Sequence, residues 1–340
     1  MIIQLTPSVT LSEKEAILKR IKSLDYKTTL VTTQRTVYIV GIGQKEFDLR
    51  QLGHMPGIAD IHRVSDDYKL VSRKWKVNRT HIDLGDGVTI GEGSLSIMAG
   101  PCSIENEEQV QQTLDHLVKN NVRIMRGGVF KPRSSPYAFR GMGVDGLMMW
   151  HNLAHKAGIK IISEVMQVSQ IEAMYDYVDI FQVGARNTQN FNLLDELGRV
   201  DKPVMIKRGI SGTIEELLYS AEYVFSAGNE KLMLCERGIR TYEKASRNTF
   251  DINAIPILKE KTHLPVIADP SHGIGIRDFV DPIALATVMA GADGVIYETH
   301  QKPEEAASDG QQTLNFEESQ NLVMKLQKAF DLRESLSVNS

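Results

Sequence analysis

Four residues with metal-binding side chains stand at or just after the ends of three apolar segments. Cys102 follows the segment SLSIMAG, His272 and Glu298 end the segments PVIADPSH and GVIYETH, and Asp309 lies in the SDGQQ that comes next. One thiol, one imidazole and two carboxylates suit a borderline divalent ion such as Mn²⁺, Fe²⁺, Co²⁺ or Zn²⁺. A lone cysteine is more often a small buried residue, as we expect of Cys235 inside LMLCERG, but four ligand types together favour a metal site.

A second group of residues is cationic and also follows apolar segments. Its members are Arg126, Lys131, Arg133, Arg186, Lys207, Arg208 and Arg237. Isolated Lys and Arg residues are usually solvated, but cations directed into one site repel one another and need anions to offset them. Arginine pairs with phosphate or carboxylate in a bidentate way, and lysine acts as a point charge. The cations therefore indicate two phosphorylated or carboxylated ligands that bind together.

The elements that must position these residues form a regular series after residue 90. Eight strand-like apolar segments span residues 94–100, 122–128, 159–166, 178–185, 203–209, 232–238, 265–272 and 294–300. Segments of helical spacing separate them, which indicates βαβ units and a parallel sheet. Eight units and a last helix from 317 to about 336 predict an α/β protein with a (β/α)₈ barrel. In such barrels the active site forms at the carboxyl ends of the strands, where both groups of residues stand.

The first 70 residues follow a different pattern. Strand-like and helical segments alternate as β-α-β-β-α-β, which is typical of a small ferredoxin-like α+β domain. This part contains no cluster of catalytic side chains, so we expect a regulatory or packing domain over residues 1–70. Residues 71–93 are expected to form a connector and a β-hairpin with an Asp-Gly turn that caps the barrel floor. The catalytic barrel then covers residues 94–338.

Composition places the chain among ordinary globular proteins. Its 340 residues are 42% hydrophobic and 24% charged, with a net charge of −4. That charge gives no reason to expect nucleic acid or a membrane as a partner. No apolar run reaches the roughly 18 residues of a membrane span, and the amino terminus lacks the features of a signal peptide. With two cysteines and no disulfide framework, the expected location is the cytoplasm.

Taken together, the motifs resemble those of the 3-deoxy-D-arabino-heptulosonate 7-phosphate (DAHP) synthase family. The matching segments, in the family's order and spacing over nearly the whole chain, are GPCS, RGGVFKPRSSPYAFRG, GARNTQN, VMIKRG, CERGIR, ADPSHGIG, ETH and SDGQQ. The family usually reads Lys-Pro-Arg-Thr-Ser where this chain has Ser134 in place of Thr, so the hydroxyl is retained. The amino-terminal pattern is similar to the subgroup with a small regulatory domain.

The resemblance implies a metal-dependent condensation of phosphoenolpyruvate with erythrose 4-phosphate, the first step of the shikimate pathway. Residues implied to bind the phosphoenolpyruvate phosphate are Arg186, Arg237 and the Ala185 amide, and Arg126, Lys131 and Lys207 would surround its carboxylate. The aldose phosphate would bind to Arg133 and Ser134 in the segment that begins with Lys131 and Pro132. The metal ligands would be Cys102, His272, Glu298 and Asp309. Glu236 and Lys131 are alternatives for handling protons, and Asp269 would orient the metal ligands or contact a sugar hydroxyl.

Cofactor and partners follow from the same resemblance. We expect one divalent metal ion, Mn²⁺ in the first place, with Fe²⁺, Co²⁺, Zn²⁺ or Cd²⁺ as alternatives. We also expect an aromatic amino acid effector, tyrosine or phenylalanine, and a homotetramer. The alternative function is that of the sister enzyme, 3-deoxy-D-manno-octulosonate 8-phosphate synthase, which uses arabinose 5-phosphate. Its aldose motif typically reads Lys-Ala-Asn-Arg-Ser, unlike the Lys-Pro-Arg-Ser that begins at Lys131. A non-catalytic amino-acid sensor is a third reading, which the intact set of strand-end residues disfavours.

Overall fold

Eight parallel strands close into a barrel in the computed structural model, which describes residues 1–43, 47–131, 137 and 139–337. The strands are β7 (Ser96–Gly100), β8 (Ile124–Gly127), β9 (Lys160–Val165), β10 (Ile180–Val183), β11 (Val204–Lys207), β12 (Leu232–Glu236), β13 (Val266–Ala268) and β14 (Gly294–Glu298). Each pairs with its neighbours in the sequence, and β14 closes the barrel against β7. The predicted (β/α)₈ barrel is therefore confirmed, with every strand within an expected segment.

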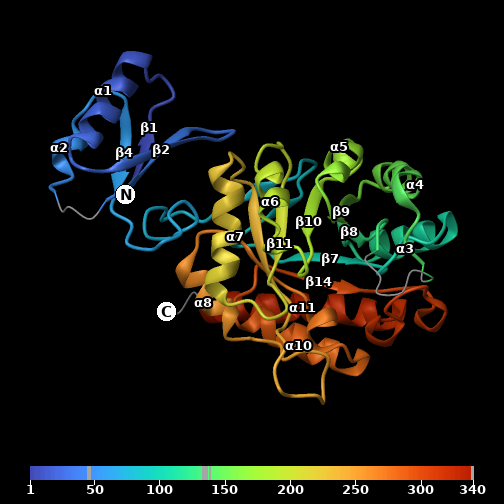
Figure 1. Ribbon diagram of the computed structural model, residues 1–340. Coiled ribbons are helices and arrows are strands. Elements are labelled where there is room, and N and C mark those ends of the chain that lie inside the picture. Colours follow the sequence, from blue (N-terminus) through green and yellow to red (C-terminus); the bar gives the residue numbers. More distant parts are fainter. Residues whose placement is uncertain (44–46, 132–136, 138, 338–340) are drawn as a thin grey trace.

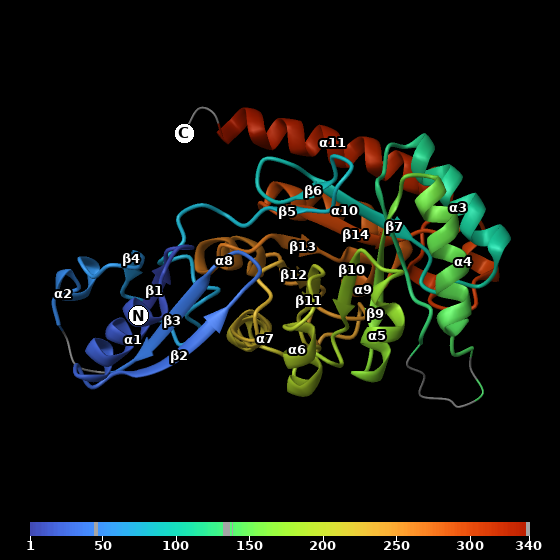
Figure 2. The ribbon, with the colours of Figure 1, turned by 90° about the horizontal axis from the view of Figure 1, so that it is seen from above.

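Helices cover the outside of the barrel (Figures 1 and 2). They are α3 (Glu107–Lys119), α4 (Gly143–Lys156), α5 (Ser169–Tyr175), α6 (Phe191–Leu197), α7 (Ile214–Ser226), α8 (Ala254–Lys261), α10 (Arg277–Met289) and α11 (Phe316–Ser337). A short helix, α9 (Pro270–Ile274), comes between β13 and α10. Between β14 and α11 lie two 3₁₀ turns, η1 (Pro303–Glu305) and η2 (Gly310–Gln312). No helix within the described part of the chain has the length and apolar character needed to span a membrane.

The interior of the barrel is filled by the inward-facing residues of alternate strand positions. Met98, Ile162, Met233 and Cys235 belong to one buried cluster there, and Cys235 is fully buried as its apolar neighbours predicted. Side chains that pack at crystal-like density leave no pore. The barrel is therefore a rigid support for groups at its rim.

A short hairpin covers the amino-terminal end of the barrel. Its strands are β5 (Ile82–Asp83) and β6 (Thr89–Ile90), and Ile82 and Ile90 join the buried cluster of the barrel interior. Asp86 in the turn pairs with Lys160, the first residue of β9, at 2.8 Å. This hairpin excludes water from the end of the barrel that lies opposite the carboxyl ends of the strands.

The amino-terminal domain is a four-stranded antiparallel sheet in the order β2-β3-β1-β4, with helices on one face. Its elements are β1 (Ile2–Leu5), α1 (Leu11–Lys22), β2 (Lys27–Thr32), β3 (Val37–Ile42), α2 (Arg50–Gly53) and β4 (Ile58–His62). This order is that of the predicted ferredoxin-like fold. The second helix is only one turn long, because Pro56 and then Gly57, with a positive φ of 88°, follow it closely.

The other face of this sheet packs against the barrel beside α7 and α8, as both views show (Figures 1 and 2). Tyr38 of β3 meets Trp75 and Phe225 edge-on, with ring centroids 5.4 and 6.0 Å away. The Thr33 hydroxyl donates to Glu230, just before β12, over 3.1 Å. Because these contacts lie at the side and at the amino ends of the strands, a chain's own amino-terminal domain stands away from the carboxyl-end rim.

Candidate active site

A cavity of about 230 Å³ lies at the carboxyl ends of the barrel strands. Its walls are Cys102, Arg126, Lys131, Glu164, Gln182, Gly184, Ala185, Arg186, Lys207, Ile210, Arg237, Arg240, Arg247, Asn248, His272 and Asp309. Seven of these residues are Lys or Arg and two are carboxylates. Two phosphate groups and one carboxylate carry roughly four to five negative charges near neutral pH. The cavity therefore has the charge to bind two anionic substrates at once.

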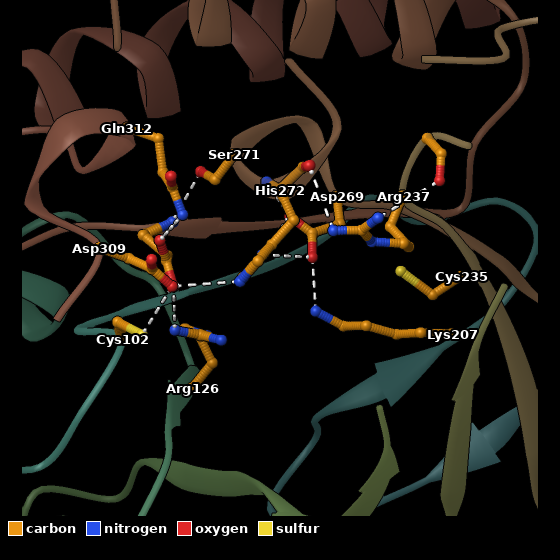
Figure 3. Close-up of polar contacts among 12 residues, drawn as sticks. Cys102, Arg126, Lys207, Cys235, Arg237, Asp269, Ser271, His272, Asp309 and Gln312 are labelled. Atoms are coloured by element: carbon orange, nitrogen blue, oxygen red, sulfur yellow. Dashed lines mark hydrogen bonds and ion pairs between the residues drawn. The ribbon is translucent and has the colours of Figure 1, made fainter. Parts of the chain in front are cut away.

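Two of the predicted anion-binding cations are held by buried carboxylates. Arg126 donates to Glu298 over 2.9 Å, and Lys207 contacts Asp269 (Figure 3). Both pairs are almost fully buried, so the guanidinium and the ammonium groups have fixed positions. Each cation also lines the cavity.

Arg186 and Arg237 differ from these two cations. Within the described residues, no carboxylate pairs with Arg186 or Arg237, and both line the cavity together with Ala185. Among the residues that the structure describes, Arg237 donates to the carbonyl oxygens of Gly238 and His272, at 3.4 and 3.3 Å. Burial lowers the pKa of Arg237, which means that its charge is incompletely compensated. An anion in the cavity would supply the missing compensation.

The residues expected to bind a metal converge at one side of the cavity. Ligand atoms of Cys102, Glu298 and Asp309 all lie within 4.8 Å of one another. The Cys102 thiol lies 3.3 Å from Asp309 Oδ2, and His272 Nε2 lies 3.4 Å from Glu298 Oε1. Burial, and then the nearby Glu298 carboxylate, raise the pKa of Cys102 to about 11. Soft sulfur, imidazole and two carboxylates at this spacing fit a borderline divalent cation, which would stabilise the thiolate.

Asp269 fixes the direction of His272. It caps α9 by accepting a hydrogen bond from the His272 backbone amide over 3.1 Å, and its Oδ2 lies 2.8 Å from His272 Nδ1. Burial would raise the pKa of Asp269, but His272 and Lys207 hold it well below its usual range. The carboxylate thus orders the imidazole so that Nε2 faces Glu298. Asp269, which directly follows the buried strand β13, thus orients the next functional side chain.

Glu236 and Lys131, the two alternatives for handling protons, differ in position. Glu236 is fully buried and does not line the cavity; its oxygens accept from Arg208 at 2.9 Å and the Gly238 amide at 2.6 Å. The same pair explains why Arg208 does not reach the cavity, although it was expected among its cations. Lys131 does line the cavity and donates to the Cys102 carbonyl oxygen over 2.7 Å.

Three of the expected substrate-binding residues, Pro132, Arg133 and Ser134, lie outside the described residues. Conversely, the cavity includes residues that the sequence reasoning missed, among them Glu164, Gln182, Arg240 and Arg247. Glu164 stands at the end of β9, in the SEV that marks that strand end, so the strand-end rule could have found it. Arg247 lies in a long loop after β12 with no local signal.

A closed (β/α)₈ barrel with a cation-rich cavity beside a thiol, an imidazole and carboxylates is the architecture of an enzyme for anionic substrates. Residues 76–335 match the DAHP synthetase I family, and the chain belongs to this family of enzymes. It is 43% identical over 332 residues to phospho-2-dehydro-3-deoxyheptonate aldolase of Thermotoga maritima, covering 97% of this chain and 98% of that protein. It is 31% identical over 258 residues to 2-dehydro-3-deoxyphosphooctonate aldolase of Syntrophobacter fumaroxidans, covering 71% of this chain and 88% of that protein.

Solved structures agree with this membership. The crystal structure of the DAHP synthase from Thermotoga maritima aligns with a TM-score of 0.78 at 42% identity, over 97% of both chains. A truncated form of the same organism's enzyme aligns with a TM-score of 0.74 at 45% identity, over 78% of this chain and 98% of that chain.

Proposed function

We propose that this protein condenses phosphoenolpyruvate with erythrose 4-phosphate to give DAHP and inorganic phosphate, in the shikimate pathway that leads to the aromatic amino acids. The observation that carries the proposal is a cavity in which Arg186 and Arg237, without a carboxylate partner among the described residues, lie beside Cys102, Glu298 and Asp309, with His272 next to Glu298. The similarity to the Thermotoga maritima enzyme over nearly the full chain supports it.

The cations would orient phosphoenolpyruvate in the cavity. Arg186, Arg237 and the Ala185 amide would bind its phosphate, and Lys131, Arg126 and Lys207 would face its carboxylate. The ion pairs of Arg126 and Lys207 with buried acids keep these two cations in place before substrate arrives. Preorganised charge of this kind does not have to reorganise during the reaction. The aldose phosphate is assigned to Arg133 and Ser134 from the motif alone.

The proposed reaction forms one carbon–carbon bond, breaks the bond between C2 and the phosphate oxygen, and requires proton transfers. C3 of phosphoenolpyruvate bonds to the aldehyde carbon, positive charge develops at C2, water adds there, and phosphate leaves by cleavage of its bond to C2. The aldehyde oxygen gains one proton. The attacking water loses both of its protons, and the second goes to the departing phosphate as the C2 ketone forms. Lys131 is the better candidate for the first transfer, because its ammonium lines the cavity while Glu236 is held by Arg208.

A divalent metal held by Cys102, His272, Glu298 and Asp309 would supply electrophilic polarisation and orientation of the aldehyde oxygen. The chemistry of the donor groups supports Mn²⁺ or another borderline ion. Asp269 and Arg126 would then keep the His272 and Glu298 side chains in place.

Turnover of the two aldoses tests the proposed function against the sister activity. We expect kcat/KM for erythrose 4-phosphate to exceed that for arabinose 5-phosphate by at least about 100-fold, because polar groups placed for one aldose length are left unpaired by the other. Phosphate release measured with each aldose, at fixed phosphoenolpyruvate and Mn²⁺, gives the ratio. A preference for arabinose 5-phosphate would assign the protein to the sister activity instead.

For the amino-terminal domain we propose control by an aromatic amino acid, tyrosine or phenylalanine. The domain contributes no side chain to the active-site cavity among the described residues, and its own-chain contacts lie away from the rim. Closing the rim would therefore require the domain of a neighbouring subunit, within the homotetramer that we propose for the cytoplasmic enzyme. An effector must bind that inhibited arrangement better than the active one, because equal affinity shifts nothing.

Deleting the amino-terminal domain should abolish inhibition and preserve activity. The cut belongs before the connector, near Ser65, because Glu222 on α7 accepts the amides of Lys69, Leu70 and Val71 at 2.9–3.0 Å. The buried Trp75 ring belongs to the same connector, donates to the Leu70 carbonyl oxygen over 2.9 Å and meets the His263 ring at 5.7 Å. We expect the shortened enzyme to turn over normally and to ignore millimolar tyrosine and phenylalanine, whereas the full chain loses activity. A full chain that is indifferent to both amino acids would rule out the proposed control.

A further inference from the structure

Gln312 is a buried amide next to the cluster of metal-binding groups. It is 3% exposed and ends the 3₁₀ turn η2, which begins just after Asp309. The backbone of Asp309 has a positive φ of 51°, a conformation that aspartate tolerates better than most residues. The tight turn therefore brings Asp309 and Gln312 to the same side of the cavity.

The side-chain amide of Gln312 donates one hydrogen bond and accepts another. Its Nε2 donates to Glu298 Oε2 over 2.8 Å, and its Oε1 accepts from Arg247 Nη1 over 3.0 Å. Ligand atoms of Glu298, Cys102 and Asp309 lie within 4.8 Å of one another, and Figure 3 shows Gln312 next to Asp309. An arginine can only donate, and an ionised carboxylate can only accept. Only one orientation of the amide therefore satisfies both neighbours.

The two oxygens of Glu298 have different partners as a result. Oε1 lies 2.9 Å from Arg126 Nη1 and 3.4 Å from His272 Nε2. Among the described side chains, the amide donor that meets Oε2 is Gln312. Without that amide, the described side chains would hold the carboxylate at Oε1 alone, and Oε2 of a fully buried residue would lack a donor.

The backbone of Arg247 is fixed by contacts with the end of α9. Its backbone amide donates to the Ile274 carbonyl oxygen over 3.1 Å. A β-carbon added to Gly275 would lie 2.3 Å from the Arg247 β-carbon, and Gly275 has a positive φ of 69°. The glycine that ends α9 thus allows the arginine to approach the loop that carries Gln312. The Arg247 guanidinium also lies 3.8 Å from Asp309 Oδ1.

We propose that Gln312 is a positioning residue of the metal centre: its amide fixes the rotation of the Glu298 carboxylate, and Arg247 fixes the direction of the amide. The inference rests on the metal site of the proposed function. It adds that the affinity for the metal depends on a neutral side chain that is not a ligand. Groups that orient a ligand in this way typically change metal affinity or activity about 10- to 100-fold when they are removed.

The test compares Gln312→Met with Gln311→Met in the full chain. Methionine keeps the length of the side chain and removes both hydrogen bonds, while the neighbouring Gln311 is exposed and serves as the matched control. Titration calorimetry of metal-free protein with Mn²⁺ should show affinity reduced about 10- to 100-fold for Gln312→Met and unchanged for Gln311→Met. The thiolate-to-Co²⁺ absorption band should shift only in the former. Excess Mn²⁺ should restore most of the activity, as expected for a defect in metal affinity.

Two further variants test the role of the Gln312 amide. If Gln312→Met does not fold, Gln312→Asn, whose amide is too short to reach, should show the same loss. Arg247→Met should weaken Mn²⁺ binding less in the Gln312→Met background than in the wild type, because it acts through the amide. If Gln312→Met binds Mn²⁺ as tightly as the wild type and its Co²⁺ band is unchanged, the proposed role of Gln312 is wrong while the proposed metal site stands. Wild-type protein that binds no divalent metal would overturn the proposed metal site as well.

Discussion

Protein treated with EDTA is expected to lose at least about 100-fold in turnover and to recover with Mn²⁺, since polarisation by a bound metal contributes several kcal/mol. The reason is the convergence of Cys102, Glu298 and Asp309 within 4.8 Å of one another. A steady-state assay with chelated, then remetallated, enzyme makes the measurement. Full activity in a verified metal-free sample would contradict the proposed metal dependence.

The two cysteines offer a matched pair for the same prediction. Cys102→Ala should reproduce the effect of EDTA and resist rescue by Mn²⁺, because a thiolate ligand is lost. Cys235→Ala removes a buried thiol from the barrel interior and should retain activity with at most a modest loss of stability.

Since burial raises the pKa of Cys102 to about 11 in the absence of metal, metal binding must release its proton near neutral pH. Metal affinity should therefore increase with pH.

Arg186→Ala and Arg237→Ala are each expected to weaken phosphoenolpyruvate binding by about 10- to 150-fold. This range corresponds to the loss of charge-assisted hydrogen bonds worth about 1.5–3 kcal/mol. Both residues line the cavity, and no carboxylate among the described residues pairs with either. The dissociation constant for phosphoenolpyruvate, measured by calorimetry with Mn²⁺ present, gives the effect.

The control for the arginine variants is the second substrate. KM for erythrose 4-phosphate, measured at saturating phosphoenolpyruvate, should change far less than the phosphoenolpyruvate constant. Arg199→Ala, which removes an exposed arginine paired with Glu196 on the surface, should leave both constants unchanged. Equal losses for the two substrates would show that the arginines do not form a clamp for one phosphate.

Local patterns in the sequence were sufficient for the architecture. Continuous apolar runs such as those around Met98 and Met233, separated by segments of helical spacing, require strands that are covered on both faces, and eight of them close a barrel. The strand-end rule then placed Cys102, Glu298 and Lys207 at one rim, because parallel strands share the direction of their carboxyl ends. These inferences need only residue order, which the chain carries by itself.

Only the tertiary structure decided which groups neutralise one another. Arg208 and Arg237 both follow strands, yet Arg208 pairs with Glu236 at 2.9 Å and does not line the cavity, whereas Arg237 does. Arg247 and Gln312 are 65 positions apart, and they meet because two long loops cross the rim of the closed barrel. Such pairings depend on the register of the strands and on loop paths, and no periodicity along the chain encodes either of them. The sequence therefore determined where chemistry can occur, and the packing of the rim decided which side chains are free to perform it.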